Sequence, residues 1–347
     1  MKEKAKRLRF EALCYSGLEP FLEAELAQLP GIKFREREKR EGAIVFRYGE
    51  AWSHFKSLRI AREVRWISHY EIPRPKAFLG HQTLTRLFSQ LDHFFEHQKK
   101  RRFKSVYVDS AGRESVVMQR LRSEIASYLK LEDVDDGGDL HIGFRRDKSK
   151  TGWEVWMRTT PRPLSLRQWR SVDYPGALNG TLAAAMVELC DPQPNDQMLN
   201  LMCGSGSLMA EWMSHESTSN RPLGGDILTA AMDAAAVNLS TFQKMPPLFQ
   251  CDSALSPFPS HRFDIVMADL PWGQLIGSSH ELESLYPALL EEVYRLLKPG
   301  GQFVLITQAI KLFERSLSYT HNRWEIKTEI KIREGNFTPR IYQLVML

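Results

Sequence analysis

The sequence of 347 residues lacks any apolar run of about 18 residues, the length that a membrane-spanning helix needs. Its first nine residues, 1–9, are charged, and no apolar stretch follows them, so they do not resemble a secretory signal. It contains no internal repeat and no low-complexity segment. Because 43% of the residues are hydrophobic, full cores can form, and we expect a soluble, cytoplasmic, globular protein.

Cysteine is scarce, and the spacing of the cysteines excludes the common metal motifs. The four cysteines, Cys14, Cys190, Cys203 and Cys251, lie far apart and form no paired metal-ligand pattern. The ten histidines are also scattered. We therefore expect ordinary thiols in a reducing compartment and no metal site.

Positive charge is concentrated in the first half of the chain. The net charge is +5, yet residues 1–170 hold 35 Lys and Arg against 23 Asp and Glu, whereas residues 171–347 hold 12 against 19. A basic half can meet a polyanion such as RNA, or it can simply be a solvated basic surface. The predicted phosphate-contacting residues are Lys99, Lys100, Arg101, Arg102, Lys104, Arg120, Arg145, Arg146, Arg167 and Arg170.

The pattern of strands and helices divides the sequence into three predicted domains. Residues 1–74 follow the order βαββαβ of a ferredoxin-like unit. After the linker Pro73-Arg-Pro75, residues 75–162 mix amphipathic helices with strands. In residues 163–347 strands and helices alternate, which predicts a doubly wound, mostly parallel α/β sheet. Two final strands at 323–332 and 340–347 are expected to close that sheet as an antiparallel pair.

Small or acidic residues follow three successive predicted strands of the third domain. Gly204 and Gly206 come directly after a strand, with a spacing that differs from the G-x-G-x-x-G dinucleotide fingerprint. Asp226 ends the next strand, where a carboxylate can accept both hydroxyls of a ribose. Asp252 ends the third strand and can accept from an adenine amino group, although both acids can instead cap helices. The predicted cofactor-binding residues are Asn200, Cys203, Gly204, Ser205, Gly206, Asp226, Ile227, Asp252, Ser253 and Asp269.

The segment Asp269-Leu-Pro-Trp-Gly273 carries the predicted reaction site. Asp269 follows an apolar strand, and Pro271 fixes the direction of the Leu270 carbonyl, so carboxylate and carbonyl form a paired acceptor for an amino group. Trp272 offers a flat face on which a base can stack. These groups suit N-methylation of an exocyclic base amine, with Asp269, Leu270, Pro271 and Trp272 as the predicted catalytic residues. The alternative is a tight turn with a capping Asp269 and a buried Trp272.

Several motifs resemble those of known methyltransferases. Residues 198–212 resemble the first motif of class I S-adenosylmethionine-dependent methyltransferases, and Asp269–Trp272 resembles the D/N-P-P-aromatic motif of amino methyltransferases. With Leu182-Ala-Ala-Ala-Met186, Leu285-Tyr-Pro287 and Leu305-Ile-Thr-Gln308, the whole chain is similar to the THUMP-domain tRNA guanine-N2 methyltransferases.

That resemblance implies a fold, a cofactor and a partner. It implies a Rossmann-like methyltransferase domain at 163–347, preceded by an α+β ferredoxin-like domain at 1–74 and a THUMP RNA-binding domain at 75–162. It implies S-adenosylmethionine as the cofactor, with Asp226 on the ribose and Asp252 on the adenine side. We expect a monomer whose partner is RNA, in particular tRNA.

Three positions depart from the family's pattern. Asn200 stands where an acid is usual, Leu270 where proline is commoner, and residues 167–170 where the segment is usually more basic. The expected function is methyl transfer to an exocyclic amine of structured RNA, most closely guanine N2 in a tRNA acceptor stem. Two alternatives stay open: an amino methyltransferase with another RNA or DNA target, and an RNA-binding protein whose methyltransferase domain has lost its activity.

Overall fold

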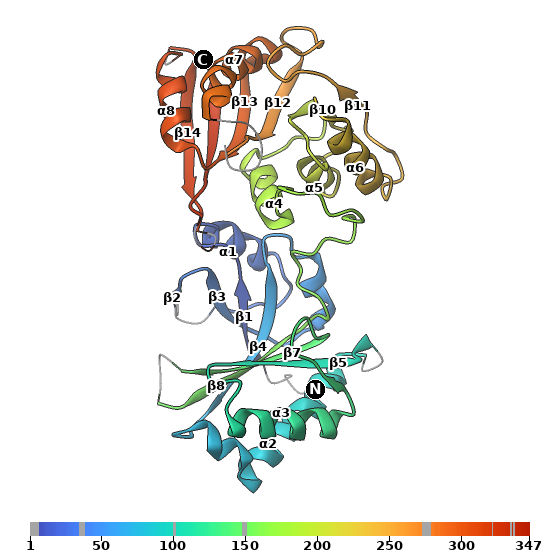
Figure 1. Cartoon of the computed structure of the whole chain (residues 1–347), viewed down its shortest axis with the longest axis vertical. Helices are drawn as coiled ribbons and strands as arrows, with labels where there is room; N and C mark the ends of the chain where they lie inside the picture. Colours follow the sequence, from blue (N-terminus) through green and yellow to red (C-terminus); the bar gives the residue numbers. More distant parts are fainter. Residues whose placement is uncertain are drawn as a thin grey trace. The chain divides into compact units, whose positions relative to one another are not determined.

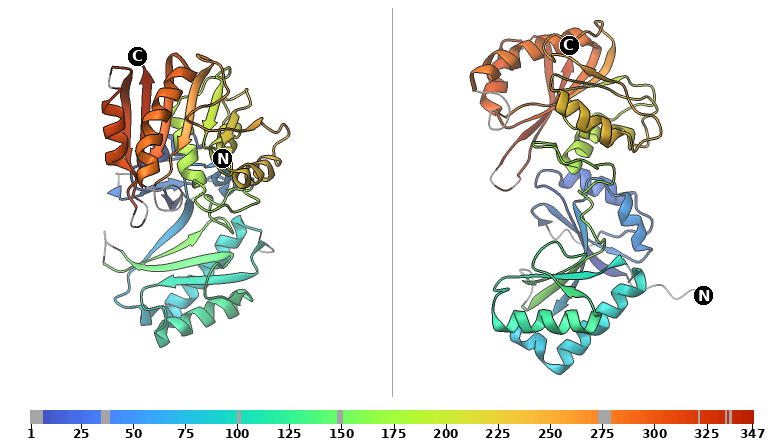
Figure 2. Two further views of the ribbon diagram at one scale, coloured as in Figure 1. Left: turned by 45° about the horizontal axis from the view of Figure 1, so that its top comes forward. Right: turned by 45° about the vertical axis from the view of Figure 1, so that its right-hand side comes forward.

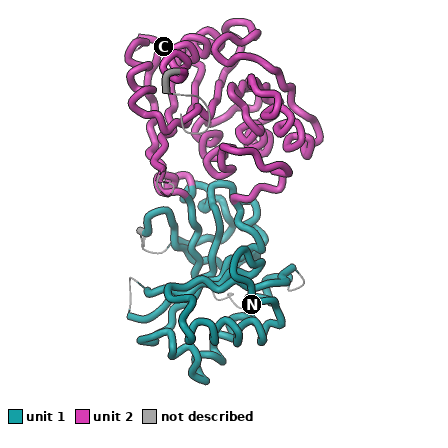
Figure 3. Tube along the Cα trace, viewed as in Figure 1, with its two compact units in different colours: residues 1–14, 22–164 teal, residues 15–21, 165–347 magenta. Residues whose placement is uncertain are grey.

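The computed structural model describes residues 7–34, 39–99, 102–147, 151–272, 279–320, 322–333, 335 and 337–347, without the side chains of residues 39, 279 and 280. The chain forms two compact units, which are residues 1–14 with 22–164 and residues 15–21 with 165–347 (Figure 3). The predicted boundary between residues 162 and 163 lies close to this division. Within the described ranges, no helix is long and apolar enough to cross a membrane.

Unit 1 is built on one eight-stranded mixed sheet (Figure 1). In spatial order its strands are β2 (Lys39–Arg40), β3 (Ala43–Tyr48), β1 (Leu8–Leu13), β4 (Glu63–Tyr70), β8 (Trp153–Arg158), β7 (Leu140–Arg146), β5 (Ser105–Ser110) and β6 (Glu132–Asp133). The helical elements are α1 (Glu19–Ala27), η1 (Trp52–Ser57), η2 (Pro75–Leu79), α2 (His81–His97) and α3 (Val116–Leu129).

This sheet runs through both predicted N-terminal domains. Strands β1 to β4 come from residues 1–74 and strands β5 to β8 from residues 75–162. The two sets join where β4 pairs antiparallel with β8, from Arg65 opposite Arg158 to Tyr70 opposite Trp153. The order βαββαβ is present in residues 1–74, with η1 as a 3-10 helix in place of the second α-helix. The ferredoxin-like and THUMP assignments stay predictions, and the two predicted domains share a continuous sheet.

The two faces of the unit 1 sheet differ in chemistry because side chains alternate along each strand. One face is aromatic and aliphatic: Phe10 packs on Trp52 of η1, Trp66 on His93 of α2, and Phe144 on Phe78 of η2. The helices α2 and α3 lie on this side of the sheet (Figures 1 and 2). The opposite face carries many charged side chains, among them Glu11, Arg65 and Glu154.

Unit 2 holds a seven-stranded sheet (Figures 1 and 2). In spatial order its strands are β11 (Leu248–Gln250), β10 (Leu223–Asp226), β9 (Met198–Leu201), β12 (Phe263–Asp269), β13 (Leu297–Thr307), β15 (Arg340–Met346) and β14 (Trp324–Lys331). The helices are α4 (Gly180–Leu189), α5 (Ser207–Met213), α6 (Thr229–Leu239), α7 (Ser279–Leu296) and α8 (Ile310–Ser318).

The strand order of unit 2 creates a crevice at a defined place. The neighbouring strands β11, β10, β9, β12 and β13 are all parallel. Strands β15 and β14 form the predicted antiparallel pair at the edge of the sheet. From β9 the chain moves outward to β10 and β11, then returns to place β12 on the other side of β9. Such a reversal opens a crevice at the carboxyl ends of the two central strands. The predicted doubly wound, mostly parallel fold is confirmed.

Two segments, residues 310–318 and 33–38, differ from the sequence prediction or lie largely outside the described residues. The sequence reading placed no element at residues 310–318, where the structure has the helix α8. The sequence pattern also predicts a strand at 33–38, as the second strand of the βαββαβ order, but residues 35–38 lie outside the described residues.

Gly143 generates a stability prediction in unit 1. A Cβ on Gly143 of β7 would lie 1.9 Å from Cε2 of Trp156 on β8, whose indole is buried beneath the Arg65 guanidinium at 3.7 Å. Since the ring must move, Gly143→Ala should lower the free energy of unfolding by about 1–3 kcal/mol. Urea unfolding would measure this, with Trp156→Phe and the double variant completing a cycle. Because the smaller ring leaves room for the methyl group, strictly additive losses would contradict the overlap.

Candidate active site

A cavity of about 1090 Å³ lies in unit 2 at the carboxyl ends of β9, β10 and β12. Four short segments that follow strands line it: Cys203–Ser205, Asp226–Leu228, Asp252–Ala254 and Asp269–Trp272. Parts of the segment 165–182 and the residues Glu281, Ser284, Leu285 and Ala288 of α7 complete the wall. The predicted cofactor and reaction sites therefore share one cavity, at the crevice that the strand order creates.

The turn after β9 is fixed by the acid that ends β10. The N–H of Gly204 donates to Oδ2 of Asp226 at 2.8 Å, and the N–H of Leu228 donates to Oδ1 at 3.0 Å. Gly206 has a φ of +83° and begins α5, and a Cβ there would press on Leu239 at 3.0 Å, so only glycine fits without strain. Asp226 thus makes a backbone contact of the capping type and also lines the cavity, so its two predicted roles are compatible.

The segment after β11 adds a second acid and a hydroxyl. Asp252 accepts the N–H of Ala254 at 2.8 Å, and the hydroxyl of Ser253 accepts the N–H of Met202 at 3.2 Å. Ile227 lines the same cavity with 59% of its surface exposed, an unusual exposure for a large aliphatic side chain. The cavity therefore offers an apolar contact beside carboxylates, which suits a flat, polar-edged ligand.

Two predicted cofactor residues do not line the cavity. Asn200 on β9 is 1% exposed, and its amide donates to the carbonyls of Leu201 and Met267, both at 3.1 Å. Gly206 lies one residue beyond the lining part of the turn. Asn200 therefore links β9 to β12, and Gly206 starts α5. Both residues support the elements that carry the cavity wall without lining the cavity themselves.

The Asp269–Trp272 turn is held by hydrogen bonds on two sides. The N–H of Leu270 donates to the carbonyl of Ile306 at 3.0 Å. The hydroxyl of Tyr286, which is 1% exposed, lies 2.8 Å from both the Pro271 carbonyl and the Thr307 hydroxyl. Within the described ranges, no group donates to the Leu270 carbonyl. These hydrogen bonds hold the turn in place, and the Leu270 carbonyl is left as an acceptor for a ligand.

Asp269 faces the cavity on one side and protein on the others. Burial raises the pKa of its carboxyl group to about 7 from an ordinary value of 3.8, and the indole N–H of Trp272 opposes part of the rise. Its partial exposure reflects the open cavity side. A carboxyl group near neutrality can hold or release a proton in the physiological range.

Trp272 and Phe337 form an aromatic pair on the cavity wall. Their ring centroids are 6.1 Å apart at an interplanar angle of 48°. The indole nitrogen of Trp272 is buried and meets no acceptor at hydrogen-bonding geometry within the described residues, so its effect on Asp269 is electrostatic. Trp272 therefore keeps a donor as well as a flat face at the site, and the predicted stacking role stays a prediction.

Arg167 and Arg170, predicted to contact RNA, lie inside unit 2. Arg167 pairs with Glu211 at 2.8 Å, and the indole of Trp169 donates to the same carboxylate at 3.3 Å. Arg170 donates to the hydroxyl of Ser207 at 2.8 Å and lines the cavity, where it is the single cation among the described lining residues. Arg170 therefore lies on the cavity wall, and Arg167 is held by Glu211 within unit 2. Contact of either arginine with RNA stays a prediction.

The other predicted RNA contacts lie in unit 1 and divide into three groups. Lys100 and Arg101 lie outside the described residues. Arg145 is paired with the buried carboxylates of Glu11 and Glu154. Exposed side chains form the third group: Lys99, Arg102, Lys104, Arg120 and Arg146. Their contact with RNA stays a prediction.

Three residues of the site were missed by the sequence reading. Tyr286 fixes the Asp269–Trp272 turn, and Phe337 pairs with Trp272. Asn238 of α6 accepts the N–H groups of Ser171 and Val172 and donates to the Ser205 carbonyl at 3.1 Å. Only Tyr286 carried a signal, since it lies in the quoted segment Leu285-Tyr-Pro287, but the segment did not reveal what its hydroxyl contacts.

Comparisons with known proteins relate most of unit 2 to methyltransferases. Residues 167–337 match a family model described as "RMKL-like, methyltransferase domain". The tRNA (guanine(6)-N(2))-methyltransferase THUMP3 of Bos taurus is 33% identical over 184 residues, which cover 49% of this chain and 36% of that protein. The tRNA (guanine(6)-N2)-methyltransferase of Thermus thermophilus is 28% identical over 196 residues, 55% of this chain and 56% of that protein. The chain thus spans about a third to about half of the length of these relatives.

Two further comparisons concern a more distant relative and a solved structure. The U6 snRNA (guanine-N(2))-methyltransferase THUMPD2 of Mus musculus is 27% identical over 131 residues, 37% of this chain and 24% of that protein. The crystal structure of TrmN from Thermus thermophilus has a TM-score of 0.74 at 22% identity, and the match covers 98% of this chain and 100% of that chain. The predicted Rossmann-like methyltransferase fold is thereby confirmed.

The raised pKa of Asp269 predicts how stability changes with pH. The folded protein keeps this carboxyl group protonated up to about pH 7, whereas the unfolded chain releases the proton near pH 3.8. Since the folded state binds more protons between these values, wild-type stability should fall relative to Asp269→Asn as pH rises from 3.8 to about 7. Urea unfolding of both proteins across this range would measure the difference. Parallel pH profiles would contradict the raised pKa.

Proposed function

We propose that this chain, whose residues 167–337 match the RMKL-like methyltransferase domain, transfers a methyl group from S-adenosylmethionine to an exocyclic base amine of structured RNA. Within this class, guanine N2 in a tRNA acceptor stem is the proposed target. The observation that carries the proposal is the rigid Asp269–Trp272 turn, with a carboxylate and an open carbonyl in the same cavity as the glycine turn.

The cavity residues fit a nucleoside-bearing cofactor. A Cβ built on Gly204 would meet nothing within 4 Å. The Ser205 hydroxyl is buried without a hydrogen-bond partner among the described residues. The turn therefore has space for a ligand beside a polar group that can bind it. When bound, S-adenosylmethionine supplies an electrophilic methyl group. Asp226 would accept the ribose hydroxyls, with Asp252 and Ser253 at the adenine edge.

A base amine would meet two acceptors at the end of β12. Guanine N2 is a poor nucleophile, because its lone pair is delocalised into the ring. Hydrogen bonds from its N–H groups to the Asp269 carboxylate and the Leu270 carbonyl would orient that lone pair. The same groups would stabilise the positive charge that develops on nitrogen. Trp272 would stack on the base, which must leave a duplex to reach the cavity.

The identity of the target rests on the relatives and on charge. THUMP3 and the Thermus protein are named for guanine N2 of tRNA, and THUMPD2 for guanine N2 of U6 snRNA. The excess of Lys and Arg in residues 1–170 supports RNA capture by unit 1. The four free cysteines fit a reducing compartment such as the cytoplasm.

Two rival functions stay distinguishable from this one. A different RNA or DNA target would leave the same cavity in place, and a protein that has lost its activity would bind RNA without methylating it. Incubating the protein with S-adenosylmethionine and, in parallel, with RNA or DNA from cells without this activity, followed by nucleoside mass spectrometry, separates the three. Appearance of N2-methylguanosine in tRNA supports the proposal, whereas another methylated base, methylated DNA alone, or no product would overturn it.

The cofactor assignment predicts a specific loss in binding. Asp226→Ala removes a carboxylate that would accept ribose hydroxyls, so affinity for S-adenosylmethionine should fall by about 2–4 kcal/mol. Isothermal titration calorimetry measures it. Asp233→Ala is the matched control, because this acid lies exposed on the adjacent helix α6 outside the cavity. Unchanged affinity in a folded Asp226→Ala protein would refute the assignment.

The acceptor role of Asp269 predicts a loss in the chemical step. Asp269→Ala should keep cofactor affinity nearly intact but slow single-turnover transfer at saturating RNA by a factor of about 10² or more. Asp269→Asn should lie between, since an amide still accepts but carries no charge. Asp264→Asn, at the opposite end of β12 and paired with Lys298, is the matched control and should retain the rate. A folded Asp269→Ala protein that transfers at the wild-type rate would exclude the acceptor mechanism.

A further inference from the structure

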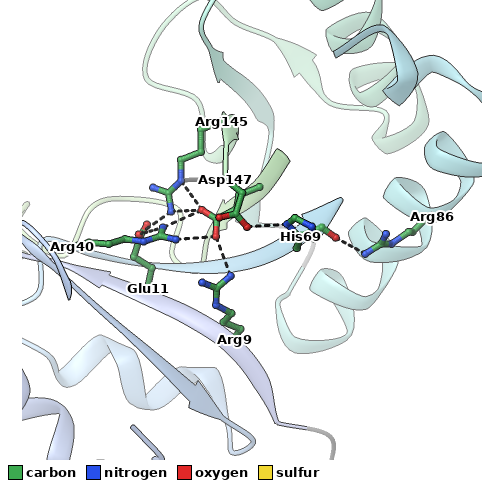
Figure 4. A network of polar contacts seen from close by, with 8 residues as sticks. Arg9, Glu11, Arg40, His69, Arg86, Arg145 and Asp147 are labelled. Atoms are coloured by element: carbon green, nitrogen blue, oxygen red, sulfur yellow. Dashed lines mark hydrogen bonds and ion pairs between the residues drawn. The ribbon is translucent and has the colours of Figure 1, made fainter. Parts of the chain in front are cut away.

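One face of the unit 1 sheet carries arginines gathered around two buried glutamates (Figure 4). In an antiparallel sheet, residues directly opposite one another point to the same face. Arg9 lies opposite Arg47, Glu11 opposite Arg65, and Arg145 opposite Glu154. We call this surface the arginine face; its cations are Arg9, Arg40, Arg47, Arg65, Arg145 and Arg158, and its carboxylates are Glu11, Glu63, Asp147 and Glu154.

The two central carboxylates, those of Glu11 and Glu154, are each 1% exposed and hold several arginines at once. Glu154 pairs with Arg9 and Arg40, both at 3.0 Å, and with Arg145 at 2.8 Å. Glu11 pairs with Arg40 at 2.7 Å and with Arg145 at 2.8 Å. Burial alone would raise the pKa of Glu154, but Arg40 and Arg145 bring it below its ordinary value. Both carboxylates therefore hold arginine side chains by ion pairs and restrict where the guanidinium groups can lie.

Three of the arginines reach the surface, whereas the two central acids do not. The side chains of Arg9 and Arg40 are each 20% exposed and that of Arg145 is 32% exposed, above the buried carboxylates. The face has six arginines and four carboxylates. One of these carboxylates, that of Asp147, contacts Nδ1 of His69 at 2.8 Å. A surplus of positive charge therefore remains at a surface whose side chains have already lost much of their freedom. Such preordered guanidinium groups suit the oxygens of phosphate groups.

Nothing in the described part of unit 1 covers this face with a helix. The aromatic contacts of η1, η2 and α2 lie on the opposite face of the sheet. Helical elements cover the apolar face of the sheet. The arginine face is therefore available to a partner. The charge of that face favours a polyanion.

We propose that the arginine face binds the phosphate backbone of the RNA substrate. This assignment rests on the proposed function, because it takes the substrate to be RNA. It shares Arg145 with the sequence-based prediction, whose other residues, such as Arg120, are not among the cations of the arginine face. Glu11 and Glu154 serve as positioning residues for the phosphate-binding arginines. An acidic peptide would match the same charges, so the test must separate the two partners.

The test compares arginines on the two sides of the sheet in the full chain. Arg47→Gln is the main variant, because the Arg47 guanidinium donates to the Arg7 carbonyl and pairs with no carboxylate in the described residues, so no buried acid loses its partner. Arg9→Gln is the second, since Glu154 keeps Arg40 and Arg145. Arg120→Gln is the control, because this side chain is 70% exposed on α3.

The binding of fluorescent tRNA is measured by anisotropy at several salt concentrations, with thermal unfolding to check the fold. We expect each sheet-face variant to bind about tenfold more weakly and to lower the salt slope by about one. Arg120→Gln should bind as the wild type does. Wild-type affinity and slope in folded Arg47→Gln would overturn the proposal, and so would an equal loss in Arg120→Gln. If Arg9→Gln does not fold, Arg47→Gln decides alone.

Two further measurements separate the partner and the function. Tighter wild-type binding of polyglutamate than of tRNA, lost in Arg47→Gln, would assign the face to an acidic peptide and overturn the RNA proposal. The second measurement is methylation of tRNA by the wild type, which tests the proposed function. If the wild type methylates no RNA, the proposed function fails, yet the tRNA titrations still decide the arginine face. If it methylates tRNA and all variants bind alike, only the arginine face fails.

Discussion

The hydrogen bonds that hold the Asp269–Trp272 turn are the constraint on which the site depends. An acceptor pair can assist a weak nucleophile only if it is already aimed before the base arrives, because reorientation during reaction would cost the stabilisation it provides. Here Leu270 is anchored to the neighbouring strand, and the Tyr286 hydroxyl fixes the Pro271 carbonyl from α7. The strand order then brings this turn beside the glycine turn, since β9 and β12 are hydrogen-bonded neighbours.

The protein uses buried carboxylates in two opposite ways. In unit 1, Glu154 is surrounded by arginines, and its pKa lies below the ordinary value despite burial. In unit 2, Asp269 pairs with no cation among the described residues, and burial raises its pKa to about 7. A buried acid with several cations is a fixed charge that organises its neighbours, whereas one without a cation is poised to gain from a donor supplied by a ligand.

The sequence predicted the elements that depend on local pattern and missed those that depend on distant partners. Alternating strands and helices, the glycine turn and the acids at strand ends were readable because each is a short-range signal. Arg170 looked like a surface cation, and only the fold shows that it reaches Ser207 at the cavity. Likewise, the link from Asn238 to Ser205 joins residues 33 positions apart, a contact that no spacing rule contains.

Asn200 illustrates how one departure from a family pattern can be reconciled with the fold. A carboxylate at this place on β9 would offer only acceptors, yet its neighbours in the structure are the carbonyls of Leu201 and Met267, which are acceptors themselves. The amide supplies the two donors that this buried position can satisfy, and it ties β9 to β12 at the strand ends that bear the two turns. Asn200 therefore braces the two strands beside the cavity. Under the proposed function, contact with the ribose would come from Asp226, whose two oxygens order the glycine turn and which lines the cavity.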